Sequence, residues 1–452
     1  MTKSLKSWWE RFLFLDRGIL PTNRLLLILG VISLGFMVAA ILGVSWLVII
    51  AFNLLVIFGS FVDFIFLPKR DQLYVKRSIP NEMERGLSYN VQVELGNASA
   101  HGLRARIIDG LPQSFEQSFP LNVTIPYGEK MTLTYETKAL FRGDYNVSKI
   151  YVRVRSAIGL WEKQLTFERE ESIQVIPDLT EAKLYLESAQ AFLLYEGEKI
   201  RKQRSGVGEF AKIRNYVVGD DPRKINWRQT AKLQEVMTNE YEPEHGKYIT
   251  LLIDCGRLMG AELLTGNRLE KALEASLTVA ASALQKGDYV AVLAFSKDVK
   301  VYVPPAKGMS HLQTIIRSLY GIKVDEAESN YAAVFQYVQT MQKKRSLLFL
   351  FSDVQTFLYE ESALAHLNRL SKRHLFLMIG IEDETIIKRK NEEPSHVKSA
   401  MIKSMAYQHL AKKTRKQLKW QSQGLHIVEA KEENLATAAV SQYIDIMNRN
   451  LL

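Results

Sequence analysis

Residues 25–67 read LLLILGVISLGFMVAAILGVSWLVIIAFNLLVIFGSFVDFIFL, a run of 43 residues with a single charged side chain, Asp63. A helix that crosses the hydrocarbon core of a bilayer needs about 20 apolar residues. The run is therefore long enough for two crossings, and Gly43, Val44 and Ser45 supply a place for the chain to reverse. We predict a two-helix transmembrane hairpin, with helices over 25–42 and 46–67.

Basic side chains flank this run on both sides, and they are Lys3, Lys6, Arg11, Arg17 and Arg24 before it and Lys69, Arg70, Lys76 and Arg77 after it. Because Lys and Arg are enriched in cytoplasmic flanks, both ends of the hairpin are expected in the cytoplasm. Residues 69–452 would then be cytoplasmic in a two-pass protein of the plasma membrane, and residues 1–24 would be a cytoplasmic N-terminal segment. Asp63 is expected to reach the headgroups. A cleaved signal peptide and a buried hairpin of a soluble protein are the alternatives.

The composition limits what the remainder can be. The 452 residues leave room for two or three globular domains after the hairpin. The single cysteine, Cys255, excludes an intrachain disulfide and fits a reducing compartment. The net charge is +10, yet no basic patch interleaved with aromatic residues indicates nucleic acid. An anionic lipid bilayer is the simpler partner for a basic membrane protein, and no nucleic acid is expected.

Residues 72–178 alternate between apolar and polar side chains. Tyr89, Val91, Val93 and Leu95 share one face of such a segment, and the same period recurs at 131–136 and 150–155. Short segments of this kind, separated by turn residues, are typical of half-buried strands. We predict an antiparallel β-sandwich that spaces or binds, because no catalytic combination of residues lies in this stretch.

From residue 247 to residue 452, continuous apolar segments alternate with segments of helical period. The expected strands are 248–253, 289–295, 347–351, 375–381 and 425–428. Strands buried on both faces and joined by helices form a parallel, doubly wound α/β sheet. Ligands of such sheets bind at the carboxyl ends of the strands. Asp254 and Asp353 follow two of these strands, and Ser329 precedes a helix that Asn330 can cap.

This arrangement resembles the von Willebrand A fold, in which an Asp-x-Ser-x-Ser motif, a loop Thr and a later Asp hold one Mg²⁺. The resemblance implies Asp254, Ser329 and Asp353 as oxygen ligands of a hard cation. Gly256 and Leu258 occupy the two serine places and offer no hydroxyl group. In the alternative interpretation, Asp254 and Asp353 cap neighbouring helices or pair with Arg257.

The segment 179–246 joins the two domains and carries the densest polar pattern, GDDPRKINW at 219–227. Gly219 begins a stretch of residues that favour a turn. We expect an ion-pair network of Arg214, Asp220 and Arg223, with Tyr216 and Trp227 packed over it. Arg, Tyr and Trp dominate the energetics of protein interfaces, so these residues either bind a partner or lock the flanking domains together.

This segment resembles the signature of the bacterial family called domain of unknown function 58. The resemblance rests on Gly-Glu-Phe at 208–210, Arg-x-Tyr at 214–216, the motif at 219–227 and Ala-Lys at 231–232. Lys232 stands where that family commonly has arginine. The order of two spans, sandwich, signature and von Willebrand A-like domain extends the resemblance to nearly the whole chain. Members of the family are often encoded beside MoxR-type AAA+ ATPases. The resemblance therefore implies an adaptor that presents clients to such an ATPase or assembles a complex at the membrane.

The sequence thus predicts a membrane-tethered cytoplasmic interaction protein, not an enzyme, that needs no cofactor, although Mg²⁺ is possible. One alternative is a metal-dependent hydrolase that uses Asp254 and Asp353. Against it, no general base is evident, and no phosphate-binding loop occurs in the right context. The other alternative is a scaffold for cell-envelope biosynthesis.

Overall fold

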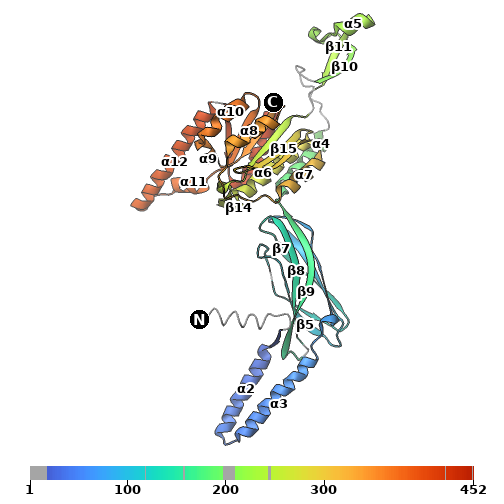
Figure 1. Ribbon diagram of the computed structural model, residues 1–452, viewed down its shortest axis with the longest axis vertical. Helices are drawn as coiled ribbons and strands as arrows, with labels where there is room; N and C mark the ends of the chain where they lie inside the picture. The colour runs from blue at the N-terminus through green and yellow to red at the C-terminus, as the bar shows by residue number, and fades with distance from the viewer. Residues whose placement is uncertain are drawn as a thin grey trace. The chain divides into compact units, whose positions relative to one another are not determined.

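The computed structural model describes residues 18–117, 119–155, 158–196, 209–242, 246–422, 424–449 and 451–452 (Figure 1). The chain divides into two compact units, Met1–Ile176 and Pro177–Leu452. Both units contain sheets, and the whole is a multidomain protein of mixed α and β structure.

The first unit opens with two apolar helices, α2 (Asn23–Ile41) and α3 (Trp46–Ile65). Thr22 caps α2, and Gly43 adopts a positive φ of 90° in the turn between the helices, a conformation that glycine tolerates best. In α3 the segment Trp46–Asp63 is long and apolar enough to cross a membrane. The apolar part of α2, Asn23–Val38, is shorter. Phe36 and Phe52 pack edge to face between the helices, with ring centroids 5.1 Å apart.

Asp63 contacts the β domain, and this contact was not predicted from the sequence. Its side chain is 1% exposed, and its Oδ2 accepts the backbone N–H groups of Leu160 at 2.7 Å and Trp161 at 3.2 Å. The indole Nε1 of Trp161 donates to the carbonyl of Ser60 at 3.0 Å. The carboxylate is held by these backbone donors, which the hydropathy of the helix does not reveal.

Two sheets follow and enclose one core. One sheet has the order β2 (Leu73–Ser78), β4 (Ser88–Asn97) and β7 (Lys130–Lys138). The other sheet has the order β1 (Ile19–Pro21), β9 (Trp161–Ile176), β8 (Gly143–Arg155), β5 (Leu103–Asp109) and β6 (Leu121–Ile125). A short strand, β3 (Glu82–Glu84), also pairs with β9. A 3₁₀ turn, η1 (Arg70–Gln72), precedes β2. The inward faces of both sheets carry the apolar residues that the alternation predicted, among them Val91, Val93, Val152 and Val154.

Arg77 is a charged residue on an inward face of the sandwich, although in the sequence it belongs to the basic flank of the membrane run. The period of β2 places Arg77 inside, where it is 3% exposed and forms an ion pair with Asp109 at 2.7 Å. Tyr135 donates to the other oxygen of Asp109 at 2.7 Å. A fully satisfied polar cluster therefore lies beside the apolar core.

The second unit starts with α4 (Thr180–Glu196), followed by a two-stranded antiparallel hairpin of β10 (Glu209–Asn215) and β11 (Met237–Glu242). A 3₁₀ turn, η2 (Pro222–Lys224), and a short helix, α5 (Trp227–Leu233), lie between the two strands. The signature segment, which the sequence presents as turn-rich, is thus also built on strands. Their residues are mostly polar, and this explains why the apolar pattern does not reveal them.

The main sheet of this unit has the order β16 (Val299–Ala306), β15 (Tyr289–Phe295), β12 (Tyr248–Asp254), β17 (Ser346–Phe351), β18 (Leu375–Ile381) and β19 (His426–Ala430). All neighbours pair in parallel except β15 and β16. Since β15 and β17 lie on opposite sides of β12, the strand order reverses at β12. Ligand sites of open α/β sheets lie at such a reversal, and β12 ends at Asp254.

Helices complete the unit. They are α6 (Arg268–Gln285), α7 (Met309–Leu319), α8 (Tyr331–Met341), α9 (Val354–Tyr359), α10 (Glu361–Ser371), α11 (Glu384–Asn391), α12 (Val397–Gln421) and α13 (Leu435–Asn448), with the short elements η3 (Arg257–Gly260), β13 (Glu262–Leu263), β14 (Gly266–Asn267) and η4 (Glu432–Asn434). Residues of α8, α9, α10 and α12 share one buried cluster with β12 and β17, while α6 contacts α7 and α13. As predicted, Asn330 caps α8 through the backbone N–H of Ala333.

Candidate functional site

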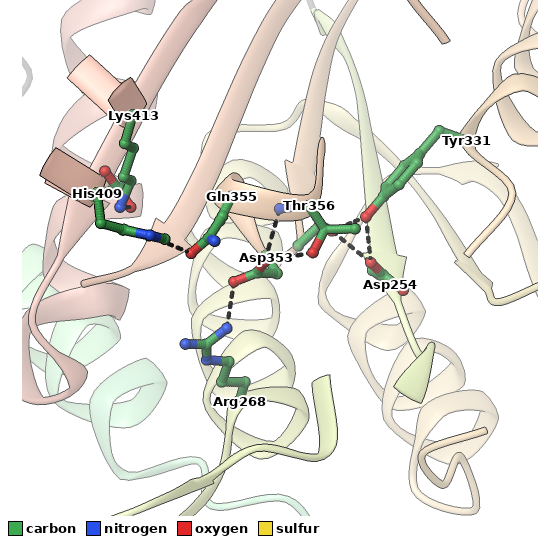
Figure 2. A network of polar contacts seen from close by, with 10 residues as sticks. Asp254, Arg268, Tyr331, Asp353, Gln355, Thr356, His409 and Lys413 are labelled. Atoms are coloured by element: carbon green, nitrogen blue, oxygen red, sulfur yellow. Dashed lines mark hydrogen bonds and ion pairs between the residues drawn. The ribbon is translucent and has the colours of Figure 1, made fainter. Parts of the chain in front are cut away.

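The carboxyl ends of β12 and β17 hold a buried polar cluster around Asp254 (Figure 2). Asp254 is 2% exposed. Its Oδ1 accepts the backbone N–H of Gly256 at 2.8 Å and the hydroxyl of Ser329, and its Oδ2 accepts the hydroxyls of Tyr331 at 3.0 Å and of Ser352. Four donors from three segments of the chain thus converge on one carboxylate.

Burial governs the protonation of this cluster. Burial raises the pKa of Asp254, and the hydrogen bonds from Ser329, Ser352, Gly256 and Tyr331 oppose that rise without cancelling it. Burial and the nearby charge of Asp254 raise the pKa of Tyr331 well above its usual value. The phenol therefore stays protonated and acts as a donor to the carboxylate.

Asp353 lies beside this cluster with partners of its own. It caps α9 by accepting the backbone N–H of Thr356 at 2.9 Å and the hydroxyl of the same residue at 2.7 Å. Its other oxygen forms an ion pair with Arg268 of α6. The alternative that Asp353 caps a helix is therefore confirmed. The other part of that alternative was a pairing with Arg257, but the Nη2 of Arg257 lies 3.1 Å from Glu328 Oε1.

The three predicted metal ligands are brought together only in part. Asp254 and Ser329 are in contact, whereas the charge of Asp353 is paired with Arg268. A serine that donates its proton keeps its oxygen lone pairs, so Ser329 remains an oxygen ligand, but Arg268 competes with a cation for Asp353. Within the described ranges, no group of three His, Cys, Asp or Glu side chains is placed to hold a metal ion. The predicted set includes a serine, which such a group does not cover, so this metal site stays a prediction.

Several residues at this site were not predicted from the sequence. Ser352 and Tyr331 adjoin residues that were singled out, and their neighbours were the only available signal. Arg268 comes from α6 and pairs with Asp353. Separate contacts lie beside the cluster, where His409 Nε2 of α12 lies 3.0 Å from Gln355 Oε1 and Lys413 pairs with Glu429 (Figure 2). These residues meet only through the fold, so their spacing in the chain carries no signal.

The signature hairpin has a second polar arrangement. The guanidinium of Arg214 binds the carboxylate of Asp220 through two hydrogen bonds of 2.8 Å. The carboxylate also accepts the backbone N–H of Val217 at 3.0 Å, and Tyr216 donates to the Asp220 carbonyl at 3.1 Å. The bonds from Arg214 and Val217 lower the pKa of Asp220. Gly219, with φ of 112°, closes the loop that this ion pair ties together.

Two of the expected network members are arranged differently. The side chain of Trp227 is 70% exposed at the start of α5 and does not pack over the ion pair. Arg223 is exposed in η2, where its backbone N–H donates to Asp221 at 3.0 Å. Val217 and Val218 are also exposed, at 60% and 96%. These side chains are thus exposed around the turn that the pair of Arg214 and Asp220 closes.

The geometry defines a multidomain α/β protein with a polar cluster at the reversal of its main sheet and a separate ion-paired hairpin. Residues 212–392, which include both features, match the model of a family described as protein of unknown function DUF58. The chain is similar to a Bacillus subtilis (strain 168) protein named "Uncharacterized protein YeaD", with 24% identity over 299 residues that cover 64% of this chain and 72% of that one.

The chain is also similar to parts of solved structures. The conserved hypothetical protein BatB from Bacteroides thetaiotaomicron is 16% identical, and the match covers 45% of this chain and 100% of BatB with a TM-score of 0.31. Salmonella alpha-2-macroglobulin reacted with methylamine is 15% identical, with a TM-score of 0.19. That match covers 23% of this chain and 7% of the macroglobulin.

Proposed function

We propose that this protein is a membrane-tethered adaptor that binds a protein partner on the cytoplasmic side. In this proposal α2 and α3 form a two-pass anchor, and residues 69–452 lie in the cytoplasm. Support comes from the length and apolar composition of α3 and from exposed side chains such as Leu47 at 79% and Phe58 at 80%. Apolar side chains exposed along a whole helix need a lipid or protein partner.

The observation that carries the adaptor function is the exposed signature surface, which we define as Val217, Val218, Arg223 and Trp227. Exposed Trp and Arg side chains are the most frequent centres of binding energy in interfaces. The bidentate pair of Arg214 and Asp220 holds the loop from within, which reduces the entropy lost when a partner binds. The surface therefore has the chemistry of a preorganised protein-binding site.

The proposed partner is a MoxR-type AAA+ ATPase, as the family resemblance implies. The α/β domain would serve as a von Willebrand A-like module, a comparison supported by the reversal of its sheet at β12 and the acidic residue at the end of that strand. The hydrolase alternative lacks support from the geometry, because hydrogen bonds and an ion pair already engage Asp254 and Asp353. The scaffold alternative shares the anchor and the surface with the adaptor.

The test measures binding of the full-length chain in lipid nanodiscs to the purified MoxR-type ATPase of the same organism. Trp227→Ala should weaken binding by about tenfold or more, the loss typical of an interface centre. Tyr127→Ala is the matched control, because Tyr127 is an aromatic residue with a similar exposure of 67%. Equal binding by both variants and the unmodified chain would contradict the role of the signature surface.

A further inference from the structure

Four arginines gather on the outer face of one sheet of the first unit. Arg104 and Arg106 come from β5, and Arg153 and Arg155 come from β8. They line a cavity of about 200 Å³ together with Asn122, Thr124 and a single carboxylate, Glu162. We call these four residues the arginine groove.

The register of the strands sets the arginines in two rows. Arg104 lies directly opposite Arg155, and Arg106 lies directly opposite Arg153. The intervening residues, such as Ala105 and Val154, face the core, so the arginines lie on the opposite face. Like charges placed directly across two strands destabilise a sheet. Arginine stays protonated at any physiological pH, so this repulsion cannot be relieved by loss of a proton.

Neighbouring side chains orient two of the four arginines. The Nε of Arg155 donates to Glu162 at 2.8 Å, and the Nε of Arg153 donates to Gln164 at 3.0 Å. Cationic side chains in the lining exceed anionic ones by three. A phosphate group is the natural counter-charge, because planar guanidinium groups bind its oxygens through paired hydrogen bonds.

The groove begins where the apolar helices join the sheet. Glu162, which lies opposite Arg155, is two residues from Leu160, whose backbone N–H binds Asp63 near the end of α3. Leu20, just before α2, lies on the other side of Glu162. Two residues of a strand span about 7 Å. The headgroup layer of a bilayer is of similar thickness, about 5–8 Å on each side.

From this position we infer that the arginine groove binds the phosphate of an anionic phospholipid in the leaflet where α3 ends. The inference rests on the proposed membrane anchor. The cytoplasmic leaflet is anionic, and each Lys or Arg near its surface strengthens attachment. The groove would hold the sheet against the headgroups while the two helices hold it in the hydrocarbon layer.

The experiment uses native mass spectrometry of the full-length chain released from nanodiscs, with discs of phosphatidylcholine alone or an equal mixture of phosphatidylcholine and phosphatidylglycerol. The unmodified chain should retain phosphatidylglycerol in preference to phosphatidylcholine. The double variant R104Q/R155Q should bind phosphatidylglycerol about tenfold to thirtyfold more weakly, since two basic side chains are lost. Arg104→Glu, at an exposed position, should also weaken binding and keeps the pair of Arg155 and Glu162 intact.

A matched control removes two positive charges from the other sheet of the same unit. Lys76 and Lys130 are exposed in β2 and β7, and K76Q/K130Q should retain phosphatidylglycerol as the unmodified chain does. Equal losses in this control and in R104Q/R155Q would overturn the inference, as would unchanged binding in Arg104→Glu.

Two further measurements are needed. One distinguishes a lipid phosphate from free phosphate, and the other distinguishes failure of the groove inference from failure of the membrane anchor. Inorganic phosphate is titrated into the chain in phosphatidylcholine discs, and binding of inorganic phosphate as tight as that of phosphatidylglycerol would assign the groove to a soluble anion. Insertion into discs is measured independently by size-exclusion chromatography. If no variant inserts, the membrane anchor fails. If all insert and none prefers phosphatidylglycerol, only the groove inference fails.

Discussion

The Oγ of Ser329 lies where a side chain on Gly256 would begin. A Cβ built on Gly256 comes within 2.1 Å of that oxygen and 3.2 Å of the Asp254 Oδ1. The loop after β12 and the loop before α8 therefore share one hydroxyl position beside Asp254. The Asp-x-Ser-x-Ser motif of the fold that the sequence resembles has a serine at the place of Gly256, and here Ser329 supplies a hydroxyl in that space.

This relationship predicts a compensating pair of substitutions. Gly256→Ser should destabilise the α/β domain by about 1–3 kcal/mol through crowding, and Ser329→Gly by about 1–3 kcal/mol because Asp254 loses a buried hydrogen bond. The double variant should lose less than the sum, because the new hydroxyl takes the vacated space. Denaturant unfolding of the full chain in detergent measures the difference.

The control for this cycle is Gly321→Ser, at a glycine where an added Cβ would meet no atom within 4 Å. It should leave the unfolding midpoint nearly unchanged. A double variant that is as unstable as the two single changes combined would show that the two positions do not share a hydroxyl site.

His374 predicts a pH dependence of stability. The side chain is 3% exposed, and burial together with the charges of Arg373 and Arg345 lowers its pKa from 6.5 to about 4. Below pH 6.5 the unfolded chain binds a proton that the folded chain resists, so stability falls as the pH drops from 6.5 to 4. The loss amounts to about 3 kcal/mol, at about 1.4 kcal/mol per pKa unit.

The measurement compares unfolding of the unmodified chain and of His374→Phe between pH 4 and pH 7. The variant should lack this part of the acid destabilisation, so its stability relative to the unmodified chain should rise as the pH falls. His426→Phe, at an exposed histidine, should keep the original pH dependence. Parallel curves for the unmodified chain and His374→Phe would refute the assignment.

The sequence predicted elements better than it predicted side-chain partners. Strands such as Tyr248–Asp254 are continuous apolar runs, and their burial follows from composition alone. The partners of Asp254 could not be read in the same way, because Tyr331 and Ser352 reach it only after the sheet has formed. In the signature, the short spacing between Arg214 and Asp220 revealed their pair, whereas the exposure of Trp227 depends on the path of α5.

Arg77 is a buried charge that hydropathy does not reveal, and it leads to a third prediction. Its guanidinium binds Asp109, Glu171 and two backbone carbonyls inside the sandwich. Arg77→Met should destabilise the first unit by about 3–5 kcal/mol, because Asp109 would remain buried without its countercharge. Thermal unfolding of the full chain in detergent, followed by hydrogen exchange at β5 and β8, measures this loss.

The matched control for Arg77 is an exposed ion pair of the same unit. Lys130 lies 3.3 Å from Glu94, and its side chain is 70% exposed. Lys130→Met should change stability by less than about 1 kcal/mol. Similar losses in Lys130→Met and Arg77→Met would mean that burial of the Arg77 pair contributes little.

Asp63 leads to the fourth prediction, which concerns the joint between α3 and the sandwich. Its carboxylate accepts two backbone N–H groups, and Phe61 stacks on the indole of Trp161 with centroids 5.5 Å apart. Asp63→Leu removes the acceptor and leaves the N–H groups of Leu160 and Trp161 without it. A hydrogen bond to a charged group contributes about 1.5–3 kcal/mol, so amide exchange at these two residues should accelerate by roughly tenfold to a hundredfold.

Hydrogen–deuterium exchange of the full chain in nanodiscs reports this change directly at residues 160–161. Asp71→Leu serves as the control, because Asp71 is an exposed carboxylate of η1 in the same unit. Exchange should stay slow in that control and in β4, far from the joint in the strand order. If Asp63→Leu leaves exchange at Leu160 and Trp161 unchanged, the carboxylate does not fasten the helix to the sheet. If exchange rises throughout the sandwich, Asp63 supports the whole domain rather than the joint.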